Sequence, residues 1–210
     1  MKKTNPDPWE SRADHLAEND WVVIDDFLPA DILHVAGNFL REKLSLNRFK
    51  EAGIGPSSEF TIEKTIRSDE IFWLGRERDK EIGGFFDLVE DIIGHLNRLC
   101  FLSISGYEFH LAHYPEGSFY KKHLDQFDSR SNRLISVVCY LNERWDETKG
   151  GQLRLYGKDD SYTDILPLPG RMVLFKSDVV PHEVLVSHDS RFSITGWLLH
   201  QPVKLGFLMG

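Results

Sequence analysis

A run of short apolar segments in the second half of the chain constrains the fold most strongly. Eight strand-like segments lie between residues 107 and 199, and turn sequences such as Pro-Glu-Gly, Lys-Gly-Gly and Leu-Pro-Gly separate them. They are residues 107–114, 119–123, 133–141, 152–156, 162–166, 171–176, 183–187 and 192–199. So many short strands suit a closed double-sheet architecture. The sequence therefore predicts a mainly β protein with supporting helices, a single-domain jelly-roll barrel of the double-stranded β-helix type.

The first half of the chain has a different pattern. Residues 21–24 look like a short strand, and residues 29–44 carry apolar side chains at helical spacing after a proline. A stronger amphipathic helix is expected at about 79–101, with its apolar stripe packed on a sheet. Between them, residues 49–61 are rich in glycine and serine and predict a long loop, and residues 62–73 follow it as a strand-like stretch.

These patterns suggest a division of the chain by role. Residues 1–103 are expected to supply helices, strands and a substrate loop that buttress the barrel, residues 104–202 the barrel itself, and residues 203–210 a C-terminal tail. A chain of 210 residues with 41% hydrophobic residues suits one such domain.

Charge and cysteine content limit the partners and the compartment. The formal net charge of −8 argues against broad attraction to nucleic acid, and no stretch is long and apolar enough to span a bilayer. The N-terminus has two lysines without an apolar run behind them, which is unlike a signal peptide. Cys100 and Cys139 are expected to be reduced. A cytoplasmic protein that acts on a small molecule, a protein or a peptide is the expectation, with no nucleic-acid or membrane partner.

Three residues form a candidate metal site: His123, Asp125 and His182. On an extended strand, residues at i and i+2 point to the same face, so His123 and Asp125 can both turn into a barrel mouth. Two imidazoles and one carboxylate can occupy one face of an Fe(II) octahedron and leave positions open for other ligands. A His-x-Asp pair alone is weak evidence in a chain with nine histidines, and His182 alone could be a packing or surface residue.

Arg191 begins the last apolar segment. In an extended strand Arg191, Ser193, Thr195 and Trp197 share one face. Such a polar stripe is costly inside a barrel unless the guanidinium pairs with an anion, such as the far carboxylate of a 2-oxo-acid. The alternative is a solvent-facing stripe on an edge strand.

Together these segments resemble the catalytic domain of the prolyl 4-hydroxylase branch of Fe(II)/2-oxoglutarate-dependent oxygenases. The resemblance is strongest to the hypoxia-inducible-factor prolyl hydroxylases and their bacterial relatives. It rests on Tyr114-Pro115 with Gly117, Tyr120, His123-Leu124-Asp125, Tyr140-Leu141-Asn142, Trp145, residues 150–154, residues 181–184 and residues 191–197. Residues 66–69 with Trp73 extend it upstream, so that it covers the region from about 101 to 202 and part of the first half.

The resemblance assigns roles around the metal. It implies that His123, Asp125 and His182 bind Fe(II). Arg191 would pair with the C5 carboxylate of 2-oxoglutarate, and Tyr140 would donate a hydrogen bond to the same group.

It assigns further contacts as well. Tyr114 and Thr195 are implied as secondary contacts of the co-substrate, and Trp197 as a wall of the pocket. Arg67 and Asp69, with the loop at 49–61, are implied to contact the substrate, although the two could equally be a weak surface ion pair.

The implied activity is hydroxylation of a prolyl residue in a protein, with O₂ and 2-oxoglutarate consumed and succinate and CO₂ released. Ascorbate is a stimulant to test, and a protein with an exposed proline-containing loop is the expected partner, a bacterial translation elongation factor being the first candidate. Two alternatives stay open. The same oxidation could act on a small molecule or another side chain, or the barrel could bind 2-oxoglutarate or metal without catalysis. A zinc hydrolase would leave Arg191 unexplained.

Overall fold

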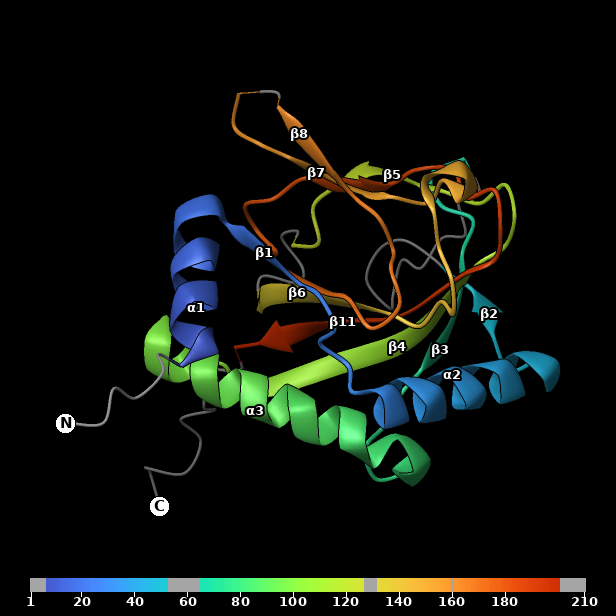
Figure 1. Cartoon of the computed structure of the whole chain (residues 1–210), viewed down its shortest axis with the longest axis horizontal. Coiled ribbons are helices and arrows are strands. Elements are labelled where there is room, and N and C mark those ends of the chain that lie inside the picture. Colours follow the sequence, from blue (N-terminus) through green and yellow to red (C-terminus); the bar gives the residue numbers. More distant parts are fainter. Residues whose placement is uncertain (1–6, 53–64, 127–131, 160, 201–210) are drawn as a thin grey trace, which may run out of the picture.

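The computed structural model describes residues 7–52, 65–126, 132–159 and 161–200. Within these ranges two antiparallel β-sheets lie face to face, and helices cover the outer face of the larger sheet (Figure 1). No helix of the described ranges has the length and apolar character needed to cross a membrane.

The larger sheet has seven strands in the order β1-β9-β6-β11-β4-β3-β2. Their bounds are β1 (Trp21–Ile24), β2 (Lys50–Glu51), β3 (Glu70–Trp73), β4 (Gly106–Tyr114), β6 (Arg133–Tyr140), β9 (Met172–Lys176) and β11 (Arg191–Leu199). The longest strands, β4 and β11, pair over their whole length from Arg191 opposite Tyr114 to Leu199 opposite Gly106. β11 is therefore the central strand, and the alternative of a solvent-facing edge strand is wrong.

The smaller sheet has four strands in the order β5-β10-β7-β8. They are β5 (Tyr120–His123), β7 (Leu153–Tyr156), β8 (Tyr162–Ile165) and β10 (His182–Val184). β5 and β10 lie next to each other, with His123 opposite His182. This pairing brings together two residues that are far apart in the sequence.

Three α-helices occur among the described residues: α1 (Pro8–Asn19), α2 (Ala30–Ser45) and α3 (Gly83–Leu99). The described ranges also contain two short 3-10 helices, η1 (Lys80–Ile82) and η3 (Glu147–Lys149). α1 begins at Pro8, which has no backbone N–H group and so leaves no donor unpaired at the start of the helix. The side chain of Asp7 accepts a hydrogen bond from the Trp9 N–H. α3 buries one stripe, formed by Phe85, Phe86, Val89, Ile92 and Leu96.

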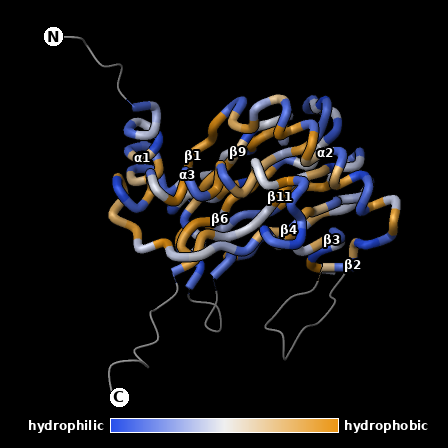
Figure 2. The backbone as a smooth tube through the Cα atoms, turned by 90° about the horizontal axis from the view of Figure 1, so that it is seen from below, coloured by the Kyte–Doolittle hydropathy of each residue, from blue (hydrophilic) through white to orange (hydrophobic). Residues whose placement is uncertain are grey.

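Period-two alternation divides the interior into two apolar clusters. Along β6, Val137 and Cys139 face the helices, whereas Val138 and Tyr140 face the smaller sheet. The helix-facing cluster also contains Ile194 of β11, and it joins all three helices to the larger sheet. Hydrophobic stretches accordingly follow the strands of this sheet (Figure 2). The cluster between the two sheets is smaller, and the polar site lies beside it.

The predicted jelly-roll architecture with helices on one face is confirmed. α1 was not predicted, and the strand expected at 183–187 is the shorter β10, which begins at His182. Of the predicted loop at 49–61, residues 50–51 form β2 and residues 53–61 lie outside the described residues. The division at 103/104 stays a prediction, although β1, β2 and β3 of the first segment belong to the same sheet as the barrel strands. The tail at 203–210 also lies outside the described residues.

Candidate metal centre

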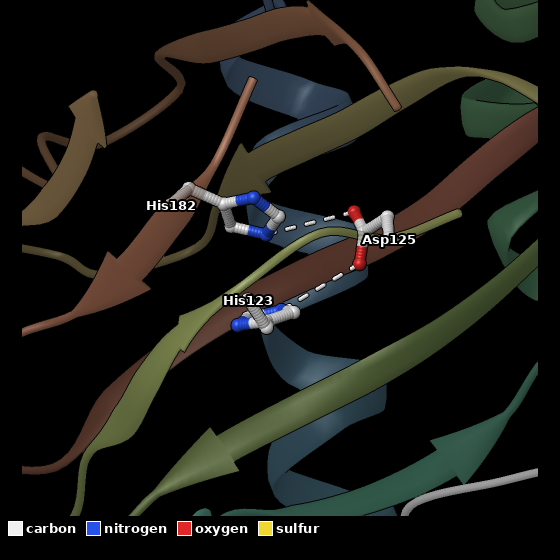
Figure 3. Close-up of side chains that lie close together, drawn as sticks. All are labelled: His123, Asp125 and His182. Atoms are coloured by element: carbon white, nitrogen blue, oxygen red, sulfur yellow. Dashed lines mark ion pairs between the residues drawn. The ribbon is translucent and has the colours of Figure 1, made fainter. Parts of the chain in front are cut away.

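The structure brings His123, Asp125 and His182 together between the two sheets (Figure 3). His123 Nε2 lies 3.6 Å from Asp125 Oδ1, and His182 Nε2 lies 3.6 Å from Asp125 Oδ2. One ligand atom from each residue lies within 4.8 Å of the others. His123 ends β5 and His182 begins β10. β5 ends at His123, as predicted, and Asp125 lies beyond it, so the alternation of side chains along an extended strand does not by itself explain how the two side chains meet.

Backbone contacts orient both imidazoles. His123 Nδ1 lies 2.7 Å from the Lys121 carbonyl oxygen, and His182 Nδ1 lies 3.2 Å from the Val180 carbonyl oxygen. A carbonyl can only accept, so each Nδ1 carries the proton and donates. Each Nε2 is then a free lone pair directed toward Asp125, which is the arrangement in which histidine binds a metal.

A serine of the larger sheet holds the Asp125 carboxylate. Ser136 of β6 donates its hydroxyl to Asp125 Oδ2 at 2.6 Å, and the Ser136 and Ser177 hydroxyl oxygens are 2.9 Å apart. Burial by itself would raise the pKa of Asp125, but His182, His123 and the Ser136 hydrogen bond together hold that pKa far below its ordinary value. Asp125 is therefore a buried anion at neutral pH.

His182 is neutral at physiological pH and so is available as a metal ligand. Burial, followed by the neighbouring His123, lowers the pKa of His182 to about 4. The Phe175 ring meets the His182 ring edge to face at 4.5 Å and fixes its plane. Two imidazoles and one carboxylate within this small space form a donor set that fits a divalent transition metal such as Fe(II).

Arg191 is buried beside this set. It is 1% exposed, and its Nε donates to the Gly151 carbonyl oxygen at 2.9 Å. The Tyr114 and Tyr140 rings lie 4.9 and 5.0 Å from its Cζ. None of the acidic residues in the described ranges forms an ion pair with Arg191. A guanidinium buried without a carboxylate is a suitable binding group for an anion from outside the chain.

Gly151 makes the Arg191 position possible. It has a φ of 65°, where a side chain would be strained. A Cβ on this residue would lie 2.9 Å from Ser187 Oγ and 3.1 Å from Arg191 Cδ. A glycine is thus required for the backbone carbonyl to approach and orient the guanidinium.

The other residues predicted to contact the co-substrate share this region. Tyr114 and Thr195 line the same cavity as the three metal-ligand candidates. Tyr140 is fully buried, and its hydroxyl has no hydrogen-bond partner among the described residues. Burial raises the pKa of Tyr140, so it keeps its proton and can donate to an anion beside Arg191. The Tyr140 hydroxyl without a partner and the guanidinium without an acidic partner, both judged among the described residues, fit a dicarboxylate such as 2-oxoglutarate.

Arg67 and Asp69 form a buried pair. Arg67 Nε donates to Asp69 Oδ1 at 2.8 Å and a terminal nitrogen donates to Oδ2 at 2.6 Å, a bidentate contact. The Asp69 side chain is 1% exposed and that of Arg67 13% exposed, so the alternative of a weak surface ion pair is wrong. Arg67 lines the cavity and stacks on the Tyr120 ring at 4.3 Å, whereas Asp69 supports it from behind.

Trp197 lines the cavity, as the sequence predicted. Its ring lies 5.6 Å from His110 and 6.4 Å from Trp73, which is 43% exposed. The Arg133 Cζ atom lies over the Trp197 ring, 3.3 Å from the ring centroid. The Trp197 side chain therefore forms a wall between the metal-ligand candidates and an exposed aromatic residue.

Sequence reasoning did not assign Ser136 or His110 to the site. Side-chain alternation could have identified both, because residues four positions apart on a strand face the same side. Ser136 lies four residues before Tyr140 on β6, and His110 lies four residues before Tyr114 on β4. Tyr120 was part of the resemblance but had no role, and it stacks on His123 with ring centroids 3.6 Å apart.

Comparisons with known proteins agree with this geometry. Residues 109–199 match the family described as the 2OG-Fe(II) oxygenase superfamily. The chain is 34% identical over 203 residues to a hypoxia-inducible factor prolyl hydroxylase of Caenorhabditis elegans; the match covers 90% of this chain but 28% of that relative.

Two solved structures are similar over most of the chain. A Pseudomonas putida prolyl-4-hydroxylase is 33% identical with a TM-score of 0.82, over 92% of this chain and 99% of that one. A Trichoplax adhaerens prolyl hydroxylase, solved in complex with a peptide fragment of the hypoxia inducible factor oxygen degradation domain, is 28% identical with a TM-score of 0.82. It matches over 91% of this chain and 88% of that one.

Proposed function

This chain belongs to the 2OG-Fe(II) oxygenase superfamily, and from that premise we propose that it hydroxylates a prolyl residue of a protein substrate. In this reaction one atom of O₂ enters the substrate, and 2-oxoglutarate is converted to succinate and CO₂. The observation that carries the proposal is the pairing of a buried His-Asp-His set with an equally buried arginine that has no acidic partner among the described residues.

The chain's own residues would hold both groups. His123, Asp125 and His182 would bind Fe(II), which supplies the one-electron and O₂ chemistry that side chains lack. Arg191 would pair with the distal carboxylate of 2-oxoglutarate, and the unpaired Tyr140 hydroxyl would donate to the same carboxylate. Because two separate anchors fix the metal and the diacid, their relative position is set before substrate arrives.

Water exclusion is the other contribution of the chain. The wall includes Val138, Leu153, Phe175 and Val184, which are all buried. An apolar lining around a polar centre protects a strong oxidant from side reactions with solvent. No side chain is needed as a general base, because the protein binds, orients and encloses.

The substrate assignment is supported by the relatives and by the cavity wall. All three of the similar proteins described above are named as prolyl hydroxylases, and one was solved with a peptide bound. In this chain Arg67 and Trp197 face the cavity and Trp73 lies exposed beside it, a surface suited to an extended peptide. The partner is then a protein with an exposed proline-containing loop, and a bacterial translation elongation factor is the first candidate to test.

The decisive experiment measures succinate release with and without proline peptides. The iron-loaded protein is incubated with 2-oxoglutarate, O₂ and unstructured peptides that contain one central proline, or alanine in its place. We expect succinate above the uncoupled rate, together with one added oxygen on the proline peptide by mass spectrometry. Stimulation by free small molecules alone would support the alternative substrate class. No succinate at all, with Fe(II) and 2-oxoglutarate still bound, would support a binding protein without catalysis.

Two further properties are proposed, one of turnover and one of location. Ascorbate is expected to stimulate turnover because it is a reductant that keeps iron ferrous, which an assay with and without ascorbate checks. Cys100 and Cys139 are free thiols, as is common in the reducing cytoplasm, and we propose that location, to be tested by cell fractionation.

A further inference from the structure

His110 lies in the wall of the cavity but belongs to neither the metal set nor the co-substrate anchor. It is on β4, opposite Thr195 of β11, with its side chain on the cavity side of the sheet. Its ring lies 5.1 Å from Trp73 and 5.6 Å from Trp197, edge to face with the first. His110 therefore connects the exposed aromatic residue with the enclosed part of the cavity.

Within the described ranges, the His110 side chain forms no hydrogen bond. The residue is 4% exposed, and its Nδ1 is buried with no partner in the described part of the chain. Burial, followed by the positive charge of Arg67, lowers the pKa of His110 to about 3, so the ring is neutral and has one N–H donor. A buried N–H group that lacks an acceptor is rarer in proteins than a buried acceptor atom that lacks a donor. The buried Nδ1 is therefore expected to carry the lone pair, and Nε2 the proton. Nε2 is also the nitrogen that is not sealed off.

The neighbouring groups indicate what His110 would bind. Asp125 is the one carboxylate among the described residues of the wall, and it faces the metal ligands; Asp69 is occupied by Arg67. The indole N–H of Trp197 is buried and also lacks a partner in the described ranges. Apart from the buried Nδ1 lone pair of His110, the unpaired groups on this side of the cavity, the His110 Nε2–H and the Trp197 indole N–H, are donors. A peptide segment at a proline matches them, because proline has no N–H and offers only carbonyl oxygens.

We propose that His110 is a substrate-binding residue that donates its Nε2–H to a main-chain carbonyl oxygen beside the target proline, an inference that rests on the proposed prolyl hydroxylation. The Trp73 ring, exposed next to His110, would cover the incoming segment. An apolar residue at position 110 would avoid burying an unpaired nitrogen, so the histidine is explained by a ligand rather than by packing.

The test compares two variants at this position. His110→Leu removes the donor at similar volume, and His110→Gln keeps an amide N–H at a similar reach. Using the iron-loaded protein and the proline peptides described above, we expect His110→Leu to raise the peptide KM about tenfold, with the KM for 2-oxoglutarate unchanged. His110→Gln should stay within about threefold of the wild type. The Tm of the His110→Leu variant should equal or exceed that of the wild type. If His110 served only to stabilise the fold, the substitution would lower the Tm.

The possible failures are distinct. An unchanged peptide KM in His110→Leu, or a parallel rise in the KM for 2-oxoglutarate, would overturn the role of His110 and leave prolyl hydroxylation standing. A wild-type protein that releases no succinate with any proline peptide would overturn the proposed function, and this inference with it.

Discussion

On one face of the larger sheet, Ile194 and Leu198 of β11 pack against the helices in an apolar cluster; on the other, Arg191 and Thr195 of the same strand line the cavity. Adjacent residues thus belong to different environments, because side chains alternate along a strand. The helix-facing side is filled by hydrophobic contacts that stabilise the fold. The cavity side keeps buried polar groups whose partners come from outside the chain. Stability and chemistry can therefore be changed separately by substitutions one residue apart.

The largest effect is expected on the cavity side at Asp125. Asp125→Ala should abolish iron binding and reduce succinate release to background, because the carboxylate supplies the charge and the third ligand of the set. The helix-facing cluster is untouched, so the variant should still fold. Metal analysis and circular dichroism on the same sample check both statements.

Ser136→Ala is the matched control for that variant. It keeps all three ligands but removes the hydroxyl that holds Asp125 Oδ2, so iron affinity should fall by about 10- to 100-fold rather than vanish. If Asp125→Ala retained iron at the wild-type level, the His-Asp-His assignment would be wrong.

The next effect is expected at Arg191. Arg191→Ala should keep iron but raise the 2-oxoglutarate requirement about 100-fold, because the co-substrate carboxylate would lose its buried cation. Arg191→Lys should lose less, since it keeps the charge without the planar fork. Iron content and the KM for 2-oxoglutarate, measured on both variants, separate the two roles. An unchanged KM in Arg191→Ala would show that the diacid is bound elsewhere.

The helix-facing side should respond in stability alone. Ile194→Ala, three residues along the same strand, should lower the free energy of unfolding by about 2–5 kcal/mol because it leaves a cavity in a fully buried cluster. Ile194→Val should lower it by about 0.5–1.5 kcal/mol. Urea unfolding measures these losses. Kinetic constants of the folded fraction should match the wild type; a changed 2-oxoglutarate KM would mean that the two faces are coupled.

The same comparison explains what the sequence could predict. Alternation and turn residues indicated the strands after residue 103, because these are local patterns in the sequence. The order and spacing of His123, Asp125, His182 and Arg191 indicated the site, because they match those of a known family. Strand pairing is not local, so the position of β11 at the centre of the sheet and the contact of Ser136 with Asp125 required the structure. The sequence also carries signals for α1 that the prediction did not use. Asp7-Pro8 is a typical helix start, and Trp9, Ala13 and Leu16, which the structure buries, are apolar residues at helical spacing.

A smaller effect than that of Ile194→Ala is the pH dependence of stability at His110, where a cavity-side residue affects the fold itself. Its pKa is lowered from 6.5 to about 3, first by burial, then by Arg67 and Arg133, against the opposing effects of Asp69 and Asp125. Below pH 6.5 the unfolded chain binds a proton that the folded chain excludes. Folding stability should therefore fall as pH decreases, by about 1.4 kcal/mol per pH unit from this group, or roughly 2 kcal/mol at about pH 5.

His110→Leu removes the contribution of His110 to the pH dependence of folding stability. The other titrating groups, including His182, are the same in the wild type and the variant. The difference in the free energy of urea unfolding between the two metal-free proteins should thus be constant above about pH 7 and should shift in favour of the variant as the pH is lowered. Parallel pH profiles would mean that His110 accepts a proton in the folded state. A neutral, enclosed imidazole would then be ruled out, and with it the reason for expecting a single Nε2–H donor at this point of the cavity.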